Sequence, residues 1–361
     1  MPSETAATMV ERIQTRVPAR PRPSKLLMIT ANPLPAQPKR WQTLWREAIR
    51  DPRELLRLLE LDELAGIISD TAAAQFPLRV PRGFAARMRR GDRHDPLLRQ
   101  VLPVVEEDLL VPGFGLDAVG DGAARGATGV IHKYQGRALL IATGSCAIHC
   151  RYCFRRHFPY ADETAAANRW QAALDYLRVD PSIHEVLLSG GDPLSLSTDK
   201  LAELTRALRD LPQIRRLRLH TRLPVVLPER VDAELLDWLD QLPWPVAIVL
   251  HVNHARELDD SVAQALADLR RTGASLLNQA VLLRGVNDSG EALAELSERL
   301  FRCGVLPYYL HQLDRVAGAA HFEVEVERAR SLHGDLQDRL PGYLVPRLVR
   351  EIAGEGSKRP L

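Results

Sequence analysis

Cysteine and lysine are scarce in this chain of 361 residues, which has 4 cysteines and 5 lysines. So few cysteines, three of them close together, do not make the disulfide framework of a small secreted protein. No apolar run reaches the length of a membrane helix, and the first 40 residues contain no signal-peptide core. The formal net charge is only +2, which excludes long-range attraction to nucleic acid or membranes. Together these absences favour a cytoplasmic globular protein with reduced thiols.

The N-terminal third divides into two parts of different composition. Residues 1–40 include the Pro- and Arg-rich stretch RVPARPRPSK, which cannot build a core, so we predict a disordered arm and expect its removal to leave activity intact. Residues 41–125 are predicted to be mainly helical. Within them, WQTLWREAIRDPRELLRLLEL has apolar residues at three- and four-residue spacing, with a helix break at Asp51-Pro52.

Six short apolar runs alternate with amphipathic helical stretches over residues 126–315. The runs are continuously apolar, which is typical of parallel strands buried on both faces. They cover 137–143, 185–190, 216–221, 246–253, 275–283 and 306–313. Six such units predict an α/β fold with a parallel sheet, either a partial barrel or a doubly wound sheet. Residues 316–361 form a C-terminal segment with a last apolar run and a Gly-rich end that we expect to be flexible.

Three cysteines lie together in CAIHCRYC, directly after the first predicted strand. They are Cys146, Cys150 and Cys153. Iron–sulfur clusters are held by cysteine thiolates, and three ligands on a four-iron cluster leave one iron open. The alternatives are a zinc site completed by His149 or His157, or buried thiols without a metal. Zinc sites usually pair two C-x-x-C elements, and the chain has no second one, so we favour the open cluster. Cys303 is predicted to be a buried apolar residue.

A C-x-x-x-C-x-x-C motif on the first βα loop resembles that of the radical S-adenosylmethionine (SAM) enzymes. The resemblance implies a partial (β/α)6 TIM-like barrel and a [4Fe-4S] cluster whose open iron chelates SAM. It also implies that Tyr152 packs near the adenine of SAM. The motif SGGDPL, after the second strand, looks like the superfamily's Gly-Gly-acid element, in which Gly190, Gly191 and Asp192 meet the amino group of SAM. Gly190 and Gly191 let the backbone approach a ligand closely.

A narrower resemblance is to the lysine 2,3-aminomutase family, over residues 95–361. It rests on CRYCFRR, SGGDPL, LHTRLPVVLPER, LNQAVLLRGVND, PYYLHQLD, GAAHF and GYLVPRLVREIAGEGSK. In that family a lysine in a Gly-rich segment forms a Schiff base with pyridoxal phosphate (PLP), and Lys358 matches it. The other lysines fit this role less well. Lys25 and Lys39 lie in the predicted arm, Lys200 opens a helix on the solvent side, and Lys133 precedes the first strand, at the wrong end of the sheet.

The resemblance also implies which residues bind the substrate. Asp314 and Glu351 match two acids that hold the side-chain ammonium of lysine, although the family typically has Asp at the second position. A buried ammonium needs paired carboxylates, so both acids favour an ω-amino substrate, while the longer Glu351 leaves the preferred chain length open. Arg155 matches the clamp on the substrate carboxylate, a task suited to a guanidinium. Arg137 matches a contact to the PLP phosphate.

The short C-terminus, the lack of further clustered cysteines for a structural zinc, and HKYQGRALL look like the elongation factor P branch of the family. Members of that branch convert (S)-α-lysine to (R)-β-lysine, which a separate ligase attaches to elongation factor P. The implied partners are lysine and a reductant such as flavodoxin or ferredoxin, and a homo-oligomer is an option. The alternatives are an enzyme making free β-lysine or acting on a related ω-amino acid, another radical SAM reaction, and a non-enzymatic iron–sulfur or zinc-binding protein.

Overall fold

The computed structural model describes residues 40–361. The predicted disordered arm over residues 1–40 therefore lies outside the described residues, apart from Arg40, and so does the expectation about its removal. No helix in the described range is long and apolar enough to cross a membrane.

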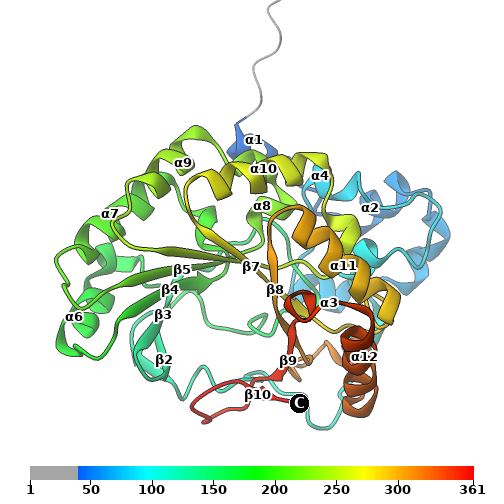
Figure 1. Ribbon diagram of the computed structural model, residues 1–361. Coiled ribbons are helices and arrows are strands. Elements are labelled where there is room, and N and C mark those ends of the chain that lie inside the picture. The colour runs from blue at the N-terminus through cyan, green and yellow to red at the C-terminus, as the bar shows by residue number, and fades with distance from the viewer. Residues whose placement is uncertain (1–39) are drawn as a thin grey trace, which may run out of the picture. The chain divides into compact units, whose positions relative to one another are not determined.

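A ten-stranded sheet forms the centre of the described residues (Figure 1). Its strands are β1 (Arg125–Ala127), β2 (Val130–Tyr134), β3 (Arg137–Thr143), β4 (Glu185–Gly190), β5 (Arg216–Thr221), β6 (Val246–Leu250), β7 (Ser275–Val281), β8 (Leu306–His311), β9 (Arg347–Arg350) and β10 (Arg359–Pro360). Strands β3 to β9 pair in parallel. The pairs β1–β2 and β2–β3 at one edge, and β9–β10 at the other, are antiparallel. Strands β3 to β8 confirm the six predicted runs.

The strand order decides between the two predicted architectures. Neighbours in the sheet follow one another in the sequence from β1 to β10 without a reversal. A doubly wound sheet reverses its order at a switch point, so this sheet is the open, partial form of a barrel. Parallel pairing continues one strand beyond the predicted six, through β9.

Amphipathic helices cover the outer face of the sheet (Figure 1). They are α6 (Gln171–Val179), α7 (Thr198–Leu208), α9 (Ala233–Asp240), α10 (Asp260–Arg271) and α11 (Gly290–Arg302), with α12 (Val326–Arg339) against α11. The short α8 (Leu223–Val226) is apolar and fully buried. Several start at a side-chain cap, because the carboxylates of Asp232 and Asp259 and the hydroxyl of Ser289 each accept the backbone N–H of the residue three positions later. Lys200 is exposed on α7, as predicted.

The N-terminal region is built from short helices, as the sequence predicts. They are α1 (Trp41–Arg46), α2 (Pro52–Leu58), α3 (Asp70–Gln75), α4 (Arg82–Ala85) and α5 (Pro96–Arg99). Short 3₁₀ helices fill the connections at Asp62–Ile67 and Val105–Asp108. Similar 3₁₀ segments occur later in the chain, at Ala167–Trp170, Pro193–Ser195, Pro228–Arg230, Ala255–Glu257, Ala320–Phe322 and Gly342–Leu344. The predicted break is confirmed, because Asp51 caps α2 with Pro52 at its first position. Leu55 and Phe84 share one hydrophobic core with Leu188 and Ile248 of the sheet.

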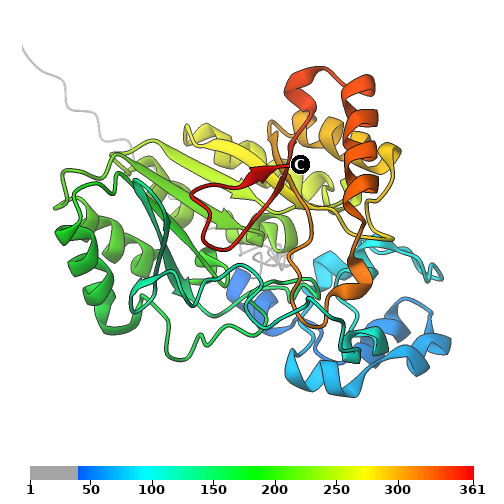
Figure 2. The ribbon, with the colours of Figure 1, turned by 90° about the horizontal axis from the view of Figure 1, so that it is seen from below.

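The C-terminal segment departs from its prediction. Its Gly-rich end was expected to be flexible, but Arg359–Pro360 returns as β10 and pairs with β9, Arg359 opposite Arg350. This hairpin, red in Figure 2, crosses the open side of the sheet. The register places Glu351, just after β9, next to Lys358, just before β10. The pairing energy of two antiparallel strands thus fixes a segment whose glycines alone predict mobility.

Candidate functional site

The three clustered cysteines lie on the loop after β3, at the carboxyl end of the parallel strands. This loop is anchored to the N-terminal region by its backbone, since His149 N donates to Arg79 O and Arg151 N donates to Gln100 O. The side chain of Arg151 is fully buried and binds both carboxylate oxygens of Glu107, at 2.8 and 2.7 Å. The helices before the barrel therefore hold the cysteine loop in place.

Neither histidine near the cysteines faces them as a ligand. His149 stacks on Phe76 and its Nδ1 lies 2.7 Å from Pro77 O, while His157 Nε2 lies 3.2 Å from Ala317 O. Both rings therefore use backbone carbonyls, as expected for neighbours. In the part of the chain that the structure describes, no group of three His, Cys, Asp or Glu side chains converges on one point as a single metal ion requires.

The cysteine set fits an iron–sulfur cluster better than a zinc ion. A four-iron cluster takes each thiolate on a different iron, so the three sulfurs need not converge. All three thiols are free of disulfides. Burial raises the pKa of the Cys146 thiol, and it raises the pKa of Cys153 to about 11. Thiolates here therefore need positive charge beside them, which cluster irons supply.

The end of β4 lies against the cysteine loop, as the SGGDPL motif predicts. Gly191 N donates to Thr143 O and Asp192 N donates to Ser145 O. Gly190 has a φ of +107°, and a Cβ there would lie 2.8 Å from Thr143 O. A Cβ on Gly191 would lie 2.5 Å from Ser145 O, so both positions require glycine. The two glycines let the strand end and the loop meet at the backbone.

The carboxylate of Asp192 is used inside the protein. Burial raises its pKa, yet its two oxygens accept hydrogen bonds from four groups. These are Thr221 Oγ1 and Arg222 N at 2.7 Å each, Leu223 N at 2.9 Å and Leu194 N at 3.1 Å. The structure therefore gives Asp192 a positioning task at the turn after β5. Its contact with the amino group of SAM stays a prediction.

Tyr152 is buried beside the cysteines, within a polar network. Its hydroxyl accepts from Arg222 Nη1 and Asn253 Nδ2, both at 2.7 Å, and donates to Gln100 Oε1 at 3.1 Å. Its ring stacks on His251, with 5.6 Å between ring centroids. Its packing near the adenine of SAM was predicted from the resemblance and stays a prediction.

A chain of ion pairs runs from the C-terminal hairpin to the cysteine loop. Lys358 Nζ pairs with Glu351 Oε2, and Lys133 Nζ lies 3.4 Å from Glu351 Oε1. Lys133 also lies 2.7 Å from Asp121 Oδ1, and Asp121 Oδ2 lies 2.7 Å from Arg155 Nε. Arg155 follows Cys153 by two residues, so this ion-pair chain joins the predicted PLP lysine to the predicted cluster loop.

The placement of Lys133 corrects the sequence interpretation. The sequence predicts Lys133 at the wrong end of the sheet, because it precedes the first parallel strand. It instead lies on β2, an unpredicted antiparallel strand that turns its side chain toward the inner side of the sheet. Two lysines, Lys133 and Lys358, therefore contact the same Glu351 carboxylate.

Asp314 and Glu351 lie near Lys358 but differ in their electrostatics. Burial works to raise the pKa of Glu351, but Lys358, Tyr134 and Lys133 outweigh it and lower that pKa to about 2. Burial raises the pKa of Asp314 to about 7, against the opposing charge of Lys358. The carboxylate of Asp314 makes no hydrogen bond or ion pair with any described residue. It is thus a half-buried acid available to an incoming cation.

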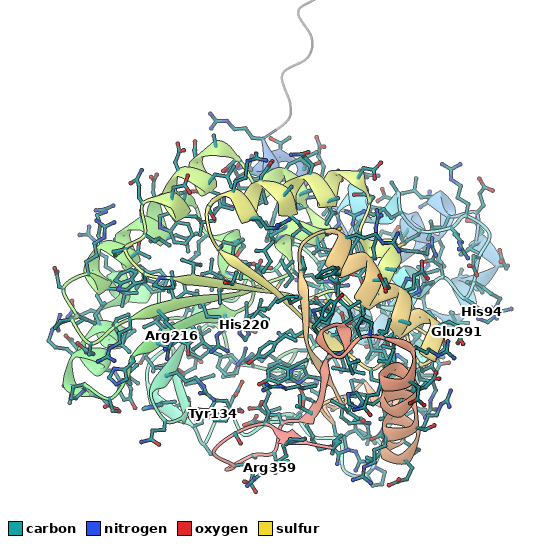
Figure 3. The ribbon with its side chains drawn as sticks, in the orientation of Figure 1. His94, Tyr134, Arg216, His220, Glu291 and Arg359 are labelled. Atoms are coloured by element: carbon teal, nitrogen blue, oxygen red, sulfur yellow. The ribbon has the colours of Figure 1, made fainter. Side chains whose placement is uncertain are left out.

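Sequence reasoning missed four residues around this site. Tyr134 donates to Glu351 at 2.7 Å, and Asp121 joins Lys133 to Arg155. Burial lowers the pKa of His220 well below its usual value and that of His311 to about 3, so both rings are neutral. His220 and Tyr134 lie on the side of the sheet that faces the C-terminal hairpin (Figure 3). The one sequence signal for the two histidines is that each is a polar residue within a predicted strand run.

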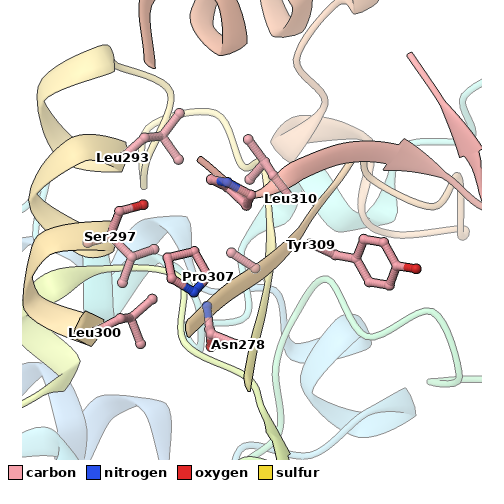
Figure 4. Close-up of a pocket in the computed structure, with 10 residues that line it drawn as sticks. Asn278, Leu293, Ser297, Leu300, Pro307, Tyr309 and Leu310 are labelled. Atoms are coloured by element: carbon pink, nitrogen blue, oxygen red, sulfur yellow. The ribbon is translucent and has the colours of Figure 1, made fainter. Parts of the chain in front are cut away.

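Two further observations test the site for a bound cofactor. His220 Nε2 is buried and has no hydrogen-bond partner among the described residues, which fits a polar ligand on the inner side of the sheet. Arg137 lies beside the same region, with its guanidinium 4.6 Å from the ring centroid of Tyr134. By contrast, the small cavity of about 10 Å³ between α11 and β8 is too small for a substrate (Figure 4). It is a packing gap, and the ring of Tyr309 points away from it (Figure 4).

Comparison with known proteins identifies the family. The sequence pattern of the radical SAM superfamily matches residues 140–297. The chain is 47% identical over 322 residues to an L-lysine 2,3-aminomutase of Escherichia coli, covering 89% of this chain and 94% of that protein. It is 42% identical over 331 residues to the enzyme of Haemophilus influenzae, covering 92% and 98%.

A more distant relative is longer than this chain. The L-lysine 2,3-aminomutase of Clostridium subterminale is 32% identical over 325 residues, covering 89% of this chain and 77% of that protein. Taken with the cysteine loop, the glycine contacts and the partial barrel, these similarities show that the chain belongs to the lysine 2,3-aminomutase family of radical SAM enzymes.

Proposed function

We propose that this chain is a PLP-dependent isomerase that converts (S)-α-lysine to (R)-β-lysine. The observation that carries the proposal is the grouping of Lys358 with Glu351 and the unpaired Asp314, joined by ion pairs to Arg155 on the cysteine loop. A lysine able to form a Schiff base thus lies beside two acids suited to a second ammonium group.

Membership of the radical SAM superfamily implies a [4Fe-4S] cluster and SAM. We assign the cluster to Cys146, Cys150 and Cys153, and SAM to the neighbourhood of Tyr152 and the SGGDPL loop, residues 189–194. PLP is assigned to Lys358, with Arg137 near its phosphate. When bound, the reduced cluster and SAM supply a carbon radical that abstracts hydrogen, and PLP supplies a conjugated ring that stabilises radicals.

The chain's own residues then bind and orient the substrate. Asp314 and Glu351 pair with its ω-ammonium, which a buried site must neutralise. Arg155 uses N–H groups other than the Nε that binds Asp121 to hold the carboxylate. The buried side chain of Arg155 and the buried Nε2 of His220 help to keep bulk water away from the reacting atoms.

We propose that the β-lysine is destined for elongation factor P, with a flavodoxin or ferredoxin as reductant, in the cytoplasm. The second candidate is release of free β-lysine, or action on a related ω-amino acid, which the replacement of the family's usual Asp by Glu351 favours. Oligomeric state and the boundaries at residues 125 and 315 remain predictions.

The proposal is tested with anaerobically reconstituted protein, PLP, SAM, dithionite and (S)-lysine, followed by chiral analysis of the product. We expect (R)-β-lysine from the wild-type protein and none from Lys358→Ala. Release of 5′-deoxyadenosine without β-lysine would retain the radical chemistry but reject lysine as substrate. Neither product, in protein with full iron content and bound PLP, would reject the proposed function.

A further inference from the structure

One buried cation touches a cluster cysteine directly. Arg222 follows β5, and its Nη1 lies 2.7 Å from Cys150 Sγ. The side chain is only 6% exposed, and its Nε has no hydrogen-bond partner among the described residues. Among the interactions described, this is the one in which a side-chain cation donates to a cysteine sulfur of the loop. Cys150 is therefore electrostatically distinct from Cys146 and Cys153.

The position of this guanidinium is fixed from both ends. Its backbone N–H donates to Asp192 at 2.7 Å, so the SGGDPL loop sets where the residue leaves the strand. Its Nη2 donates to Glu257 Oε2 at 2.8 Å and to Gln100 Oε1 at 2.7 Å. Because a planar guanidinium held at both ends has little freedom, its Nη1 stays directed at the sulfur.

Glu257 is the carboxylate that pairs with the guanidinium of Arg222. It is fully buried, and its other oxygen, Oε1, accepts from Asn253 N at 3.0 Å, His254 N at 3.1 Å and Gln100 Nε2 at 3.1 Å. The carboxylate therefore stays ionised and partly cancels the positive charge of Arg222 at the sulfur. Removal of either partner changes the charge near Cys150 by one unit, in opposite directions.

We propose that Arg222 is a positioning residue that raises the reduction potential of the cluster through Cys150, and that Glu257 opposes it. The proposal depends on the cluster assigned above to the three cysteines. Reduction adds one electron, here from dithionite, and so adds one negative charge to the cluster and its thiolates. A cation and an N–H donor at a ligand sulfur stabilise that reduced form, since hydrogen bonds to the sulfurs and nearby charge set cluster potentials.

The test is an anaerobic redox titration of the reconstituted cluster, followed by the electron paramagnetic resonance of the reduced form. It is run without PLP or lysine, so it does not depend on the proposed reaction. We expect Arg222→Gln to lower the reduced-to-oxidised ratio at a fixed potential at least tenfold, which is about 59 mV for a one-electron couple. Arg222→Lys should fall between this variant and the wild type, and Glu257→Gln should move the midpoint upward.

Arg218→Gln is the matched control. Arg218 lies on β5, the strand that Arg222 follows. It pairs with Glu185 at 2.6 Å and touches no cysteine, so its loss should leave the midpoint unchanged. Equal midpoints for Arg222→Gln and the wild type, at equal iron and sulfide content, would overturn the proposal. So would shifts of the same sign for Arg222→Gln and Glu257→Gln. If Arg222→Gln binds no cluster, the Glu257→Gln midpoint decides: an upward shift supports the proposal and an unchanged value rejects it.

Discussion

The Nζ of Lys133 lies 2.7 Å from Oδ1 of Asp121, a carboxylate that is 2% exposed. The second oxygen of Asp121 lies 2.7 Å from Nε of Arg155. Burial works to raise the pKa of Asp121, but Arg155 and Lys133 together lower it. One buried acid therefore holds two cations, one on β2 and one on the cysteine loop.

Asp121→Asn should destabilise the fold strongly, because it leaves the buried guanidinium of Arg155 without its carboxylate and removes the nearer of the two acids paired with Lys133. Loss of one member of a buried ion pair typically costs about 3–5 kcal/mol. We expect a clear fall in Tm by calorimetry at neutral pH. The control is Glu291→Gln, which removes an exposed acid paired with Arg339 on the surface and should leave Tm unchanged (Figure 3). Equal Tm values for Asp121→Asn and Glu291→Gln would contradict this account.

Lys358 and Lys133 compete for the role of PLP lysine, and covalent trapping separates them. We expect borohydride reduction of the PLP-loaded protein, followed by peptide mass mapping, to label Lys358. Lys133→Ala should keep the aldimine absorbance, and Lys358→Ala should lose it. Labelling of the peptide that contains Lys133 instead would transfer the assignment to β2.

Asp314 should make lysine binding depend on pH. Its pKa is raised to about 7, so the carboxyl is neutral below that pH and becomes a partner for an ammonium above it. We expect KM for lysine to fall as the pH rises through about 7, and Asp314→Asn to remove this dependence. The variant should also raise KM about 10- to 100-fold above that pH, from loss of about 1.5–3 kcal/mol. A pH profile identical to that of the wild type would exclude Asp314 from substrate binding.

The same raised pKa has the opposite consequence for stability. The folded protein favours the neutral carboxyl, so the ionised form of Asp314 costs stability as the pH rises from the unfolded-state pKa of about 3.9 through about 7. Asp314→Asn should therefore have a higher Tm than the wild type above neutral pH, and the difference should vanish in acid. Thermal melts at several pH values check the sign.

Glu351 should set the preferred length of the substrate. Its side chain is one methylene longer than the Asp typical of the family, so it reaches further toward the amine. Glu351→Asp should raise the preference for lysine over ornithine, measured as the ratio of kcat/KM values, about tenfold, since one methylene is worth about 1–3 kcal/mol. A ratio unchanged by the substitution would show that Glu351 does not limit chain length.

The four cysteines should separate into two classes on substitution. Cys146→Ala, Cys150→Ala and Cys153→Ala should each lose most of the bound iron and sulfide after reconstitution. Cys303→Ala should keep them, because Cys303 is a buried thiol packed in the hydrophobic core beside α11. Full iron content in any of the first three variants would remove that residue from the ligand set.

The sequence predicted the parts of the fold that depend on short-range patterns. The six strands from β3 to β8 and the helices between them follow from apolar runs and amphipathic spacing. The break at Asp51-Pro52 follows from a cap and a proline. The proximity of SGGDPL to the cysteines follows from parallel pairing, because Gly190 ends β4 and Cys146 comes just after the neighbouring β3.

The parts that failed depend on pairing between distant segments. Strand β2 is only five residues long and carries His132 and Lys133, so its composition does not identify a strand. Strand β10 has two residues, and its pairing with β9 overrides a Gly-rich sequence that alone favours flexibility. The hydrogen bond from Arg222 N to the carboxylate of Asp192 likewise joins two loops that no local motif connects.

An open barrel has two sheet edges, and each edge is a row of backbone groups on which another chain could pair and aggregate. Here both are kept short. Strand β1 has three residues and an irregular register between Arg125 and Ala127, and β10 has two residues, one of them a proline without an N–H. The hairpin that carries Lys358 thus has a second consequence: it lets the sheet stay open for a substrate without offering a template for fibre-like assembly.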